Sequence, residues 1–157
     1  MNMPEFEAGL LKAVPDIRYF ARNLTRDPDA ADDLTQDVLE KAIKRRDHFQ
    51  GGNIAAWLMT MTRNLFIDQN RSKKRKPEVA YDEGHDPRHN PGSVGQQDDM
   101  NDLNNALGQM TQSCQEILSL IGIGYRYSEI ADMVGIEIGT VMSRLSRCRR
   151  KLAGIIR

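Results

Sequence analysis

The last helix that the sequence predicts carries hydroxyl and cationic side chains along one face. At about 100° per residue, one stripe of this helix collects five such residues: Thr140, Ser143, Arg144, Arg147 and Lys151. An arginine can bridge guanine O6 and N7 or hold phosphates, while threonine and serine can bond to either kind of base edge. This chemistry indicates a helix that reads duplex DNA in the major groove.

The residues before this helix have the spacing of a helix-turn-helix motif. Ala131, Gly135 and Val141 follow one another at intervals of four and six residues. We expect a first helix from the N-cap Ser128 to Val134 and a left-handed turn at Gly135. The stripe expected to be buried consists of Ile138, Val141, Leu145, Cys148 and Leu152. A solvated basic helix would also explain the charge, but the motif spacing favours DNA binding.

A second basic segment lies in the middle of the chain. Asn64, Asp68, Arg71 and Arg75 recur at helical intervals and end in the run NRSKKRK, which can neutralise DNA phosphates. The loop before it, DHFQGGN, combines amides, an aromatic ring and two glycines, as in proteins that hold an unstacked base. From the residues alone, base binding by this loop is a hypothesis.

Three helices are expected in the first half of the chain. The first runs from Glu5 to about Thr25, and we expect Pro15 to kink or interrupt it. The second begins at the N-cap Asp27 with Pro28 in its first turn. Its apolar face comprises Ala31, Leu34, Val38 and Ala42.

The third helix follows the break at Gly51-Gly52, with Asn53 as a plausible cap. Its apolar face comprises Ile54, Trp57, Leu58, Met61 and Leu65. We interpret Trp57 as a core residue, because it fits this apolar stripe. Two further helices are expected in the last third, around Asp99–Met110 and from Ser113 to about Ile121.

The formal net charge of zero conceals a strong segregation of charge. Residues 41–76 contain ten basic and two acidic residues, residues 77–102 contain one basic and seven acidic residues, and seven basic residues follow from Arg126 onward. Residues 77–97 are rich in proline and glycine and show no hydrophobic period. The predicted fold class is therefore all-α, with two small helical domains, residues 1–76 and 98–157, joined by a flexible acidic linker, residues 77–97.

Several functions find no support in the sequence. No apolar run approaches the roughly 18 residues of a membrane span, and the N-terminus lacks the basic-then-apolar order of a signal peptide, so we expect a cytoplasmic protein without membrane insertion. His85 and His89 could bind a metal, but they lack a third spaced anchor, and a solvated loop is favoured. No nucleophile has a recognisable base. We expect no cofactor, no metal and no enzymatic activity.

The two cysteines, Cys114 and Cys148, have no metal-ligand spacing and suggest no disulfide framework. We expect reduced thiols, with Cys148 as a small residue of the buried stripe.

Three stretches resemble extracytoplasmic-function (group 4) sigma factors of bacterial RNA polymerase. DAADDLTQDVLEKAIKRRDHF resembles their region 2.1–2.2, NIAAWLMTMTRNLFIDQNRSKKRK resembles region 2.3–2.4, and YSEIADMVGIEIGTVMSRLSRCRRKL resembles region 4.2. The resemblance implies an alternative sigma factor that binds core polymerase and directs promoter-specific transcription initiation. Residues 1–76 would then form a region 2 domain, and residues 98–157 a region 4 domain.

The resemblance also implies roles for matched positions. Docking on the β′ clamp helices would fall to Asp33, Gln36, Asp37 and Glu40. Recognition and melting of the −10 element would fall to Asp47, His48, Phe49, Gln50, Asn53, Arg63, Asn64, Asp68, Arg71, Lys74 and Arg75. Recognition of the −35 element would fall to Thr140, Ser143, Arg144, Arg147 and Lys151.

Further partners follow from the same resemblance. The polymerase β flap and promoter DNA are expected partners. The ADDL…RRDHF and RNLF stretches are similar to the alphaproteobacterial general-stress subgroup, whose members are held by an anti-sigma factor. The chain departs from the family at Ile138, where proline is frequent, and at Met142, where a basic residue is frequent. We therefore assign Met142 no DNA contact and expect it to touch the domain core or an inhibitory partner.

Two alternatives stay open at this point. A stand-alone helix-turn-helix regulator would bind DNA tightly without polymerase. A sigma-like mimic would keep the fold for protein binding and lose promoter function.

Overall fold

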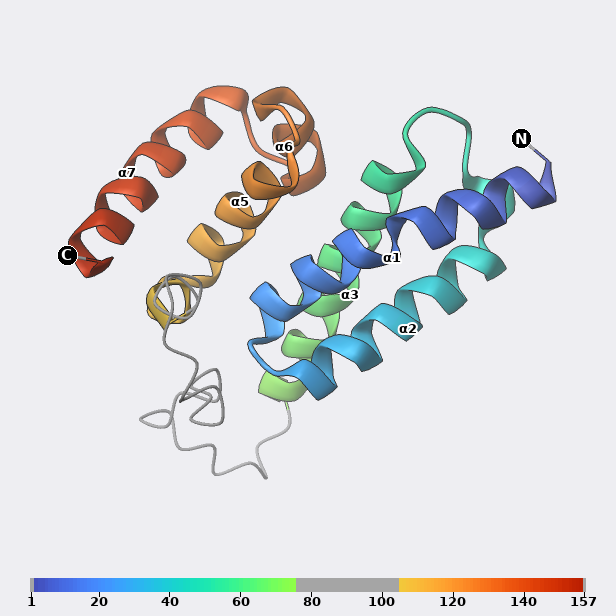
Figure 1. Cartoon of the computed structure of the whole chain (residues 1–157), viewed down its shortest axis with the longest axis horizontal. Helices are drawn as coiled ribbons and strands as arrows, with labels where there is room; N and C mark the ends of the chain where they lie inside the picture. Colours follow the sequence, from blue (N-terminus) through green and yellow to red (C-terminus); the bar gives the residue numbers. More distant parts are fainter. Residues whose placement is uncertain (1, 76–104, 157) are drawn as a thin grey trace. The chain divides into compact units, whose positions relative to one another are not determined.

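The computed structural model describes residues 2–75 and 105–156, which divide between two compact units, Met1–His85 and Asp86–Arg157 (Figure 1). The described residues contain helices and turns, and no strand occurs among them. The predicted all-α class with two helical domains is confirmed. The predicted linker, residues 77–97, lies outside the described residues, as does most of the helix expected from residue 99.

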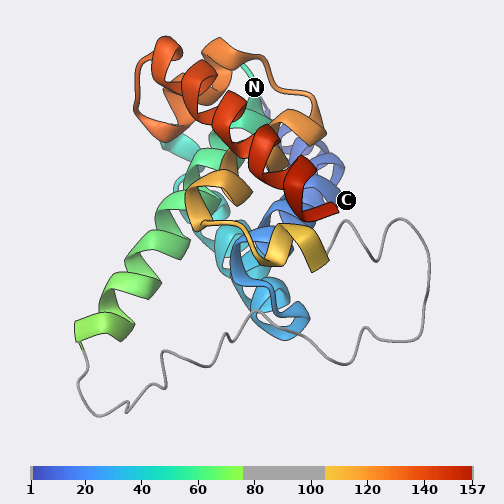
Figure 2. The ribbon, with the colours of Figure 1, turned by 90° about the vertical axis from the view of Figure 1, so that its left-hand side faces the viewer.

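The first unit is built from three helices, α1 (Met3–Thr25), α2 (Pro28–Lys44) and α3 (Ile54–Arg75), each of which packs against the other two. α1 and α2 run antiparallel, and the last turns of α3 project beyond them (Figure 2). The predicted start of α2 is confirmed, because the Asp27 side chain accepts a hydrogen bond from the amide of Asp29 at 3.1 Å. All four residues of its predicted apolar face are buried.

The helix α1 continues through Pro15, so the expected interruption is wrong. Proline removes one backbone donor and leaves the carbonyl four residues earlier, that of Leu11, without its helical partner. Leu11 is exposed, so water can reach this side of the helix. The buried side keeps the helix continuous through the burial of Ala13, Ile17 and Phe20 in the core.

A short connection joins α2 to α3. A 3-10 turn, Arg46–His48, is followed by Gly51 and Gly52, which adopt φ angles of 94° and 87°. Such left-handed conformations favour glycine. The Asn53 side chain then accepts a hydrogen bond from the Ala56 amide at 3.2 Å, as predicted for the cap of α3.

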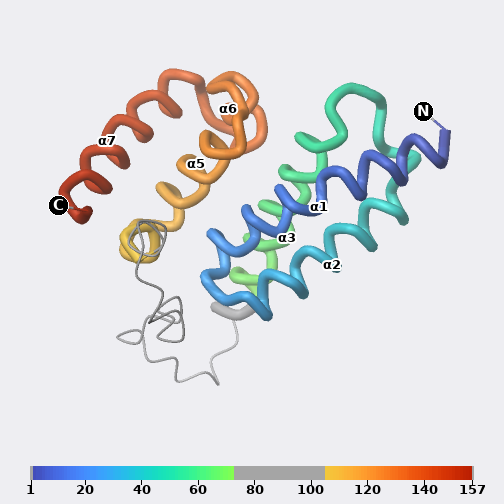
Figure 3. The backbone as a smooth tube through the Cα atoms, in the orientation of Figure 1, coloured from blue at the N-terminus to red at the C-terminus, as the bar shows by residue number. Residues whose placement is uncertain are grey.

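The second unit contains a helical turn at 105–108 and the helices α5 (Gln112–Ile123), α6 (Tyr127–Val134) and α7 (Ile138–Ile156). α5 and α7 run antiparallel, and α6 lies in the connection between them (Figure 3). Gly135 ends α6 in the left-handed region at φ 78°, and its amide donates to the Ala131 carbonyl at 2.8 Å. The predicted helix, turn and helix are confirmed.

Two details of this motif differ from the prediction. Arg126, and not Ser128, is the N-cap of α6, and its amide donates to the Glu129 carboxylate at 2.8 Å. The side chain of Glu129 thus binds back to the cap, which starts the helix before Ser128. Ile138 is 47% exposed, although it was expected in the buried stripe. Ile138 is the first residue of α7 and lies at the edge of the interface between α7 and its domain. Val141, about one turn further on, is fully buried.

The cysteines form a disulfide between Cys114 in α5 and Cys148 in α7, so the expectation of reduced thiols is wrong for this structure. Their Cα atoms lie 5.6 Å apart, although 34 residues separate them in the sequence. The packing of the first turn of α5 against the middle of α7 produces this pairing. Met110, Leu118, Leu152 and Ile155 pack around it.

No helix among residues 2–75 and 105–156 combines the length and the hydropathy that a membrane crossing requires.

Candidate nucleic-acid interface

The helix α7 turns one face to its domain and the opposite face to solvent. Val141, Leu145 and Cys148 are buried and fix the rotation of the helix. Of the predicted DNA-reading stripe, Ser143, Arg147 and Lys151 are exposed, and Thr140 is half-buried. The structure therefore leaves most of this polar stripe accessible to a ligand.

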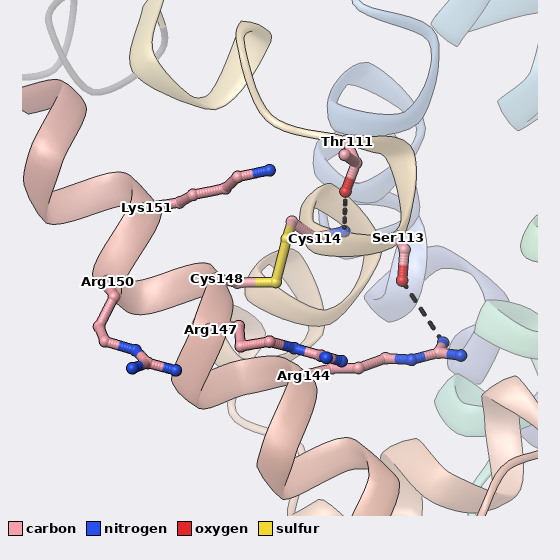
Figure 4. A pocket seen from close by; sticks show the side chains of 8 residues that line it. All are labelled: Thr111, Ser113, Cys114, Arg144, Arg147, Cys148, Arg150 and Lys151. Atoms are coloured by element: carbon pink, nitrogen blue, oxygen red, sulfur yellow. Dashed lines mark hydrogen bonds between the residues drawn. A yellow bond between two sulfur atoms is a disulfide. The ribbon is translucent and has the colours of Figure 1, made fainter.

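Arg144 lies differently from the rest of the stripe. Its side chain is half-buried, and its Nη1 atom donates to the Ser113 hydroxyl at 3.4 Å (Figure 4). Seen along the helix axis, Arg144 is only about 60° from Val141, so it borders the buried stripe. Its guanidinium contacts the first turn of α5 and lies away from the outer face of α7.

The outer face of α7 includes residues that the sequence interpretation missed. Ser146 and Arg150 are exposed, and at about 100° per residue they lie roughly 140° and 180° from the buried Val141. Both therefore lie farther around the helix from the buried stripe than Arg144 does. Angles measured from the buried stripe, rather than from the centre of the polar stripe, would have identified them.

A basic hollow lies between α7 and the first turn of α5. It is open to solvent, has a volume of about 740 Å³ and is lined by Thr111, Ser113, Cys114, Arg144, Arg147, Cys148, Arg150 and Lys151. Lys151 extends along one side of the disulfide, and Arg144 and Arg147 extend along the other (Figure 4). Four cationic side chains without a carboxylate in the lining make this hollow attractive to anions.

The start of the helix-turn-helix is held by an electrostatic cap. The backbone hydrogen bond from Arg126 lowers the pKa of the Glu129 carboxyl, and the Arg126 guanidinium, 3.4 Å away, acts in the same direction. The ionised carboxylate therefore stabilises the first turn of α6.

The acidic face predicted on α2 is present as an exposed surface. Asp33, Gln36, Asp37 and Glu40 are all exposed. Their intervals of three and four residues place them on one side of the helix, and Leu34 and Val38 are buried on the other. A side-chain contact ties this face to α3, because Gln69 donates to the Asp37 carboxylate at 3.2 Å.

The loop predicted to capture a base divides into an anchored part and an exposed part. The Phe49 ring centroid lies 5.2 Å from that of Trp57 and 6.3 Å from that of Phe6. Phe49 and Trp57 are both half-buried, so Trp57 joins the core only partly. The remaining candidates of the loop, Asp47, His48, Gln50 and Asn53, are exposed.

The helix α3 displays the other predicted −10 residues that the structure describes. Asn64, Asp68 and Arg71 are exposed, and Arg63 is half-buried. Lys74 and Arg75 belong to the last turn of α3, but their side chains lie outside the described residues. The last turns of α3, which follow these residues, project beyond α1 and α2 (Figure 2).

Metal binding has no support in the described ranges, since no cluster of three or more histidine, cysteine, aspartate or glutamate side chains there could hold an ion. His85 and His89 lie outside those ranges.

Comparisons with known proteins match both units. Residues 10–76 match the family Sigma-70 region 2, and residues 100–152 match the family Sigma-70, region 4. The chain is 36% identical over 150 residues to the ECF RNA polymerase sigma factor EcfG of Rhodopseudomonas palustris, covering 94% of this chain and 82% of that relative. It is 30% identical over 158 residues to the ECF RNA polymerase sigma factor SigL of Mycobacterium tuberculosis, covering 93% and 88%.

A solved structure has a similar fold over nearly the whole chain. It is the sigma factor RpoE of Bartonella quintana in complex with the anti-sigma factor NepR, with a TM-score of 0.83 and 36% sequence identity. The similarity covers 98% of each chain.

Proposed function

The chain belongs to the extracytoplasmic-function sigma factors of bacterial RNA polymerase, and we propose that it divides promoter recognition between exposed faces of its two units. As a member of this family it binds core RNA polymerase and directs promoter-specific transcription initiation. Sigma factors are initiation factors and not enzymes. The protein acts in the cytoplasm, where the polymerase works.

The observation that carries this proposal is the outer face of α7. Behind the turn at Gly135, the helix buries Val141 and Leu145 and exposes hydroxyl and guanidinium groups on other sides. A helix of this kind fits the major groove of duplex DNA, which presents distinct donors and acceptors for each base pair. Ser143 and Arg147 read the −35 element, and Thr140, Arg144 and Lys151 support that contact.

The first unit binds core polymerase and recognises the −10 element. The exposed acidic face of α2, formed by Asp33, Gln36, Asp37 and Glu40, docks on the β′ clamp helices. The exposed loop residues Asp47, His48, Gln50 and Asn53 hold an unstacked base of the −10 element. Asn64, Asp68, Arg71 and the basic end of α3 meet the DNA of the −10 element, where the cations neutralise phosphates. Phe49 anchors the loop through its ring contacts with Phe6 and Trp57.

We further propose residues 1–76 as region 2, residues 77–97 as the linker and residues 98–157 as region 4, which also contacts the β flap. An anti-sigma factor similar in role to NepR is a further partner, because the Bartonella sigma factor of similar fold was solved in complex with one. Ile138 and Met142, which are 47% and 52% exposed at the start of α7, offer apolar contacts to such a partner.

Reconstituted transcription tests the proposal. Core polymerase is incubated with promoter DNA and with the wild-type chain, Arg147→Ala or the matched control Arg149→Ala. We expect transcription to depend on the added chain, to fall with Arg147→Ala and to change little with Arg149→Ala. Specific DNA binding by the chain alone, without polymerase-dependent transcription, would identify a stand-alone regulator. Core binding without any transcript from genomic promoter fragments would identify a sigma-like mimic.

A further inference from the structure

The disulfide between Cys114 and Cys148 belongs to a small buried cluster that borders the open basic hollow. Both cysteines line the basic hollow, although only 8% of Cys114 and 3% of Cys148 is exposed. The hollow is wide enough, at about 740 Å³, to admit a small peptide-sized molecule. A reagent that enters it lies next to the two cysteines.

The charges around the disulfide favour one class of reagent. Arg144, Arg147, Arg150 and Lys151 line the hollow together with the two sulfur atoms (Figure 4). Cys114 also lies in the first turn of α5, where its amide donates to the side chain of the N-cap Thr111 at 3.2 Å. Cations and a helix N-terminus both stabilise a thiolate, the form that attacks disulfides and leaves from them. The same charges concentrate anionic molecules in the hollow.

We propose that Cys114 and Cys148 form a thiol–disulfide exchange site, and that its substrates are low-molecular-weight thiols and disulfides that carry negative charge. The thiol–disulfide chemistry is independent of promoter recognition, and only its effect on transcription rests on the proposed role of α7. Disulfides in the cytoplasm are rare and usually transient or redox-sensing, which fits a reversible bond.

The exchange balances in two steps. The thiolate of the first small thiol attacks the sulfur of Cys114, the more exposed of the two residues, and the Cys148 sulfur leaves as a thiolate beside the arginines. A second small thiolate then attacks the small-molecule sulfur of the mixed disulfide. This attack releases a small disulfide and the Cys114 thiolate. Two small thiols thus lose two electrons to the protein cysteines, and each protein thiolate takes a proton from water. Oxidation by a small disulfide runs through the same steps in reverse.

The bond connects two elements that matter to DNA recognition. Cys148 lies in the middle of α7, one residue from Arg147, and Cys114 lies in the helix that α7 packs against. When the bond is present, it ties α7 to α5 at this level. When the bond is absent, noncovalent contacts hold α7 in place, among them the packing of Val141 and Leu145 and the hydrogen bond from Arg144 to Ser113. The redox state of the small-thiol pool therefore sets how firmly the helix is held.

The first experiment measures the exchange itself in the full-length chain. The oxidised protein is reduced with glutathione, which is anionic, or with cysteamine, which is cationic, and free cysteines are counted by alkylation and mass spectrometry. The rate of each thiol is divided by the rate at which the same thiol reduces a small neutral disulfide. At low ionic strength we expect a preference of about fivefold or more for glutathione, which shrinks in about 0.5 M salt. Equal normalised rates, or no reduction of the folded protein, would overturn the proposal.

Matched variants locate the source of the preference. Arg147→Gln removes a cation that lines the hollow, while Arg149→Gln removes the same charge from an exposed neighbour on the same helix. We expect Arg147→Gln to lower the glutathione preference and Arg149→Gln to leave it nearly unchanged. Equal losses would mean that net charge, and not the hollow, attracts the thiol, and would count against the site.

Single-cysteine variants test the order of the steps. With glutathione disulfide, Cys148→Ser should accumulate a mixed disulfide on Cys114 several times faster than Cys114→Ser does on Cys148. The reverse order would contradict the assigned point of attack. The wild-type reduction requires no substitution, so it decides the proposal even if a variant fails to fold. Promoter transcription by the oxidised and reduced chain is measured separately. If the exchange occurs but the oxidised and reduced chains transcribe equally well, the exchange site stands, and the result counts against the −35 role of α7.

Discussion

The Arg144 guanidinium donates to the Ser113 hydroxyl across 3.4 Å, while Arg147, one helical turn further along α7, is exposed. The two arginines belong to the same polar stripe, yet the first is tied to α5 and the second is accessible. Their neighbouring positions in the sequence therefore correspond to different tasks. Arg144 holds α7 on its domain, and Arg147 is available to DNA.

This difference leads to a prediction for promoter binding by the reconstituted holoenzyme. Arg147→Ala should weaken binding to a selected promoter by about 1–3 kcal/mol, the usual cost of losing an arginine contact to a base. Arg144→Ala should weaken it less and should instead lower the melting temperature of the free protein. Binding is measured by titration of labelled promoter DNA, and stability by thermal unfolding. A larger binding loss with Arg144→Ala would contradict the assignment.

The acidic face of α2 gives a prediction for polymerase binding. Asp33→Lys reverses a charge at the N-terminal end of this exposed face and should weaken binding to core polymerase by on the order of tenfold. Asp16→Lys makes the same change on an exposed position of α1 and should have little effect. Competition with a labelled sigma factor for core enzyme measures both. Similar losses for the two variants would show that the net charge of the unit, and not the α2 face, determines affinity.

The aromatic cluster gives a prediction that separates anchoring from base capture. Phe49→Ala removes a half-buried ring that packs on Phe6 and Trp57, so it should lower the free energy of unfolding by about 2 kcal/mol, less than for a fully buried phenylalanine. His48→Ala, at the exposed neighbouring position, should leave stability nearly unchanged and reduce open-complex formation. Urea unfolding and permanganate footprinting of the melted promoter measure the two effects. Unchanged stability in Phe49→Ala would remove the anchoring role.

The cap of α6 gives a prediction for pH. The pKa of Glu129 is lowered from its ordinary value of 4.5 in the folded protein, so its contribution to stability is present above that value. This contribution is lost as the pH falls below 4.5 through the folded pKa. Glu129→Gln should therefore have a lower melting temperature than wild type near pH 7, and the difference should shrink as the pH falls below 4.5. Asp132→Asn removes a charge from the same helix without touching the Arg126 hydrogen bond and should cost less at pH 7. A Glu129→Gln deficit that persists at low pH would contradict an electrostatic cap.

Local signals in the sequence accounted for much of the fold. Asp27 and Pro28 predicted the start of α2, Gly135 predicted the turn of the helix-turn-helix, and Asn53 predicted the cap of α3. These features depend on hydrogen bonds and φ angles within a few residues, so the sequence carries them directly. The errors at Pro15, Ser128 and Ile138 arose where packing or a competing cap outweighed a local preference.

The sequence by itself determined the helical elements, the segregation of charge and the resemblance to sigma factors, because periodicity, caps and motif spacing are properties of consecutive residues. Only the tertiary structure decided that Cys114 meets Cys148, that Arg144 turns to Ser113 and that Phe49 packs on Phe6. Each of these contacts joins residues from different helices or from a helix and a loop, and the separation in sequence is 34 residues for the cysteines. Such contacts depend on the rotation and register of whole elements as they bury their apolar faces, and that packing is fixed only when the elements assemble.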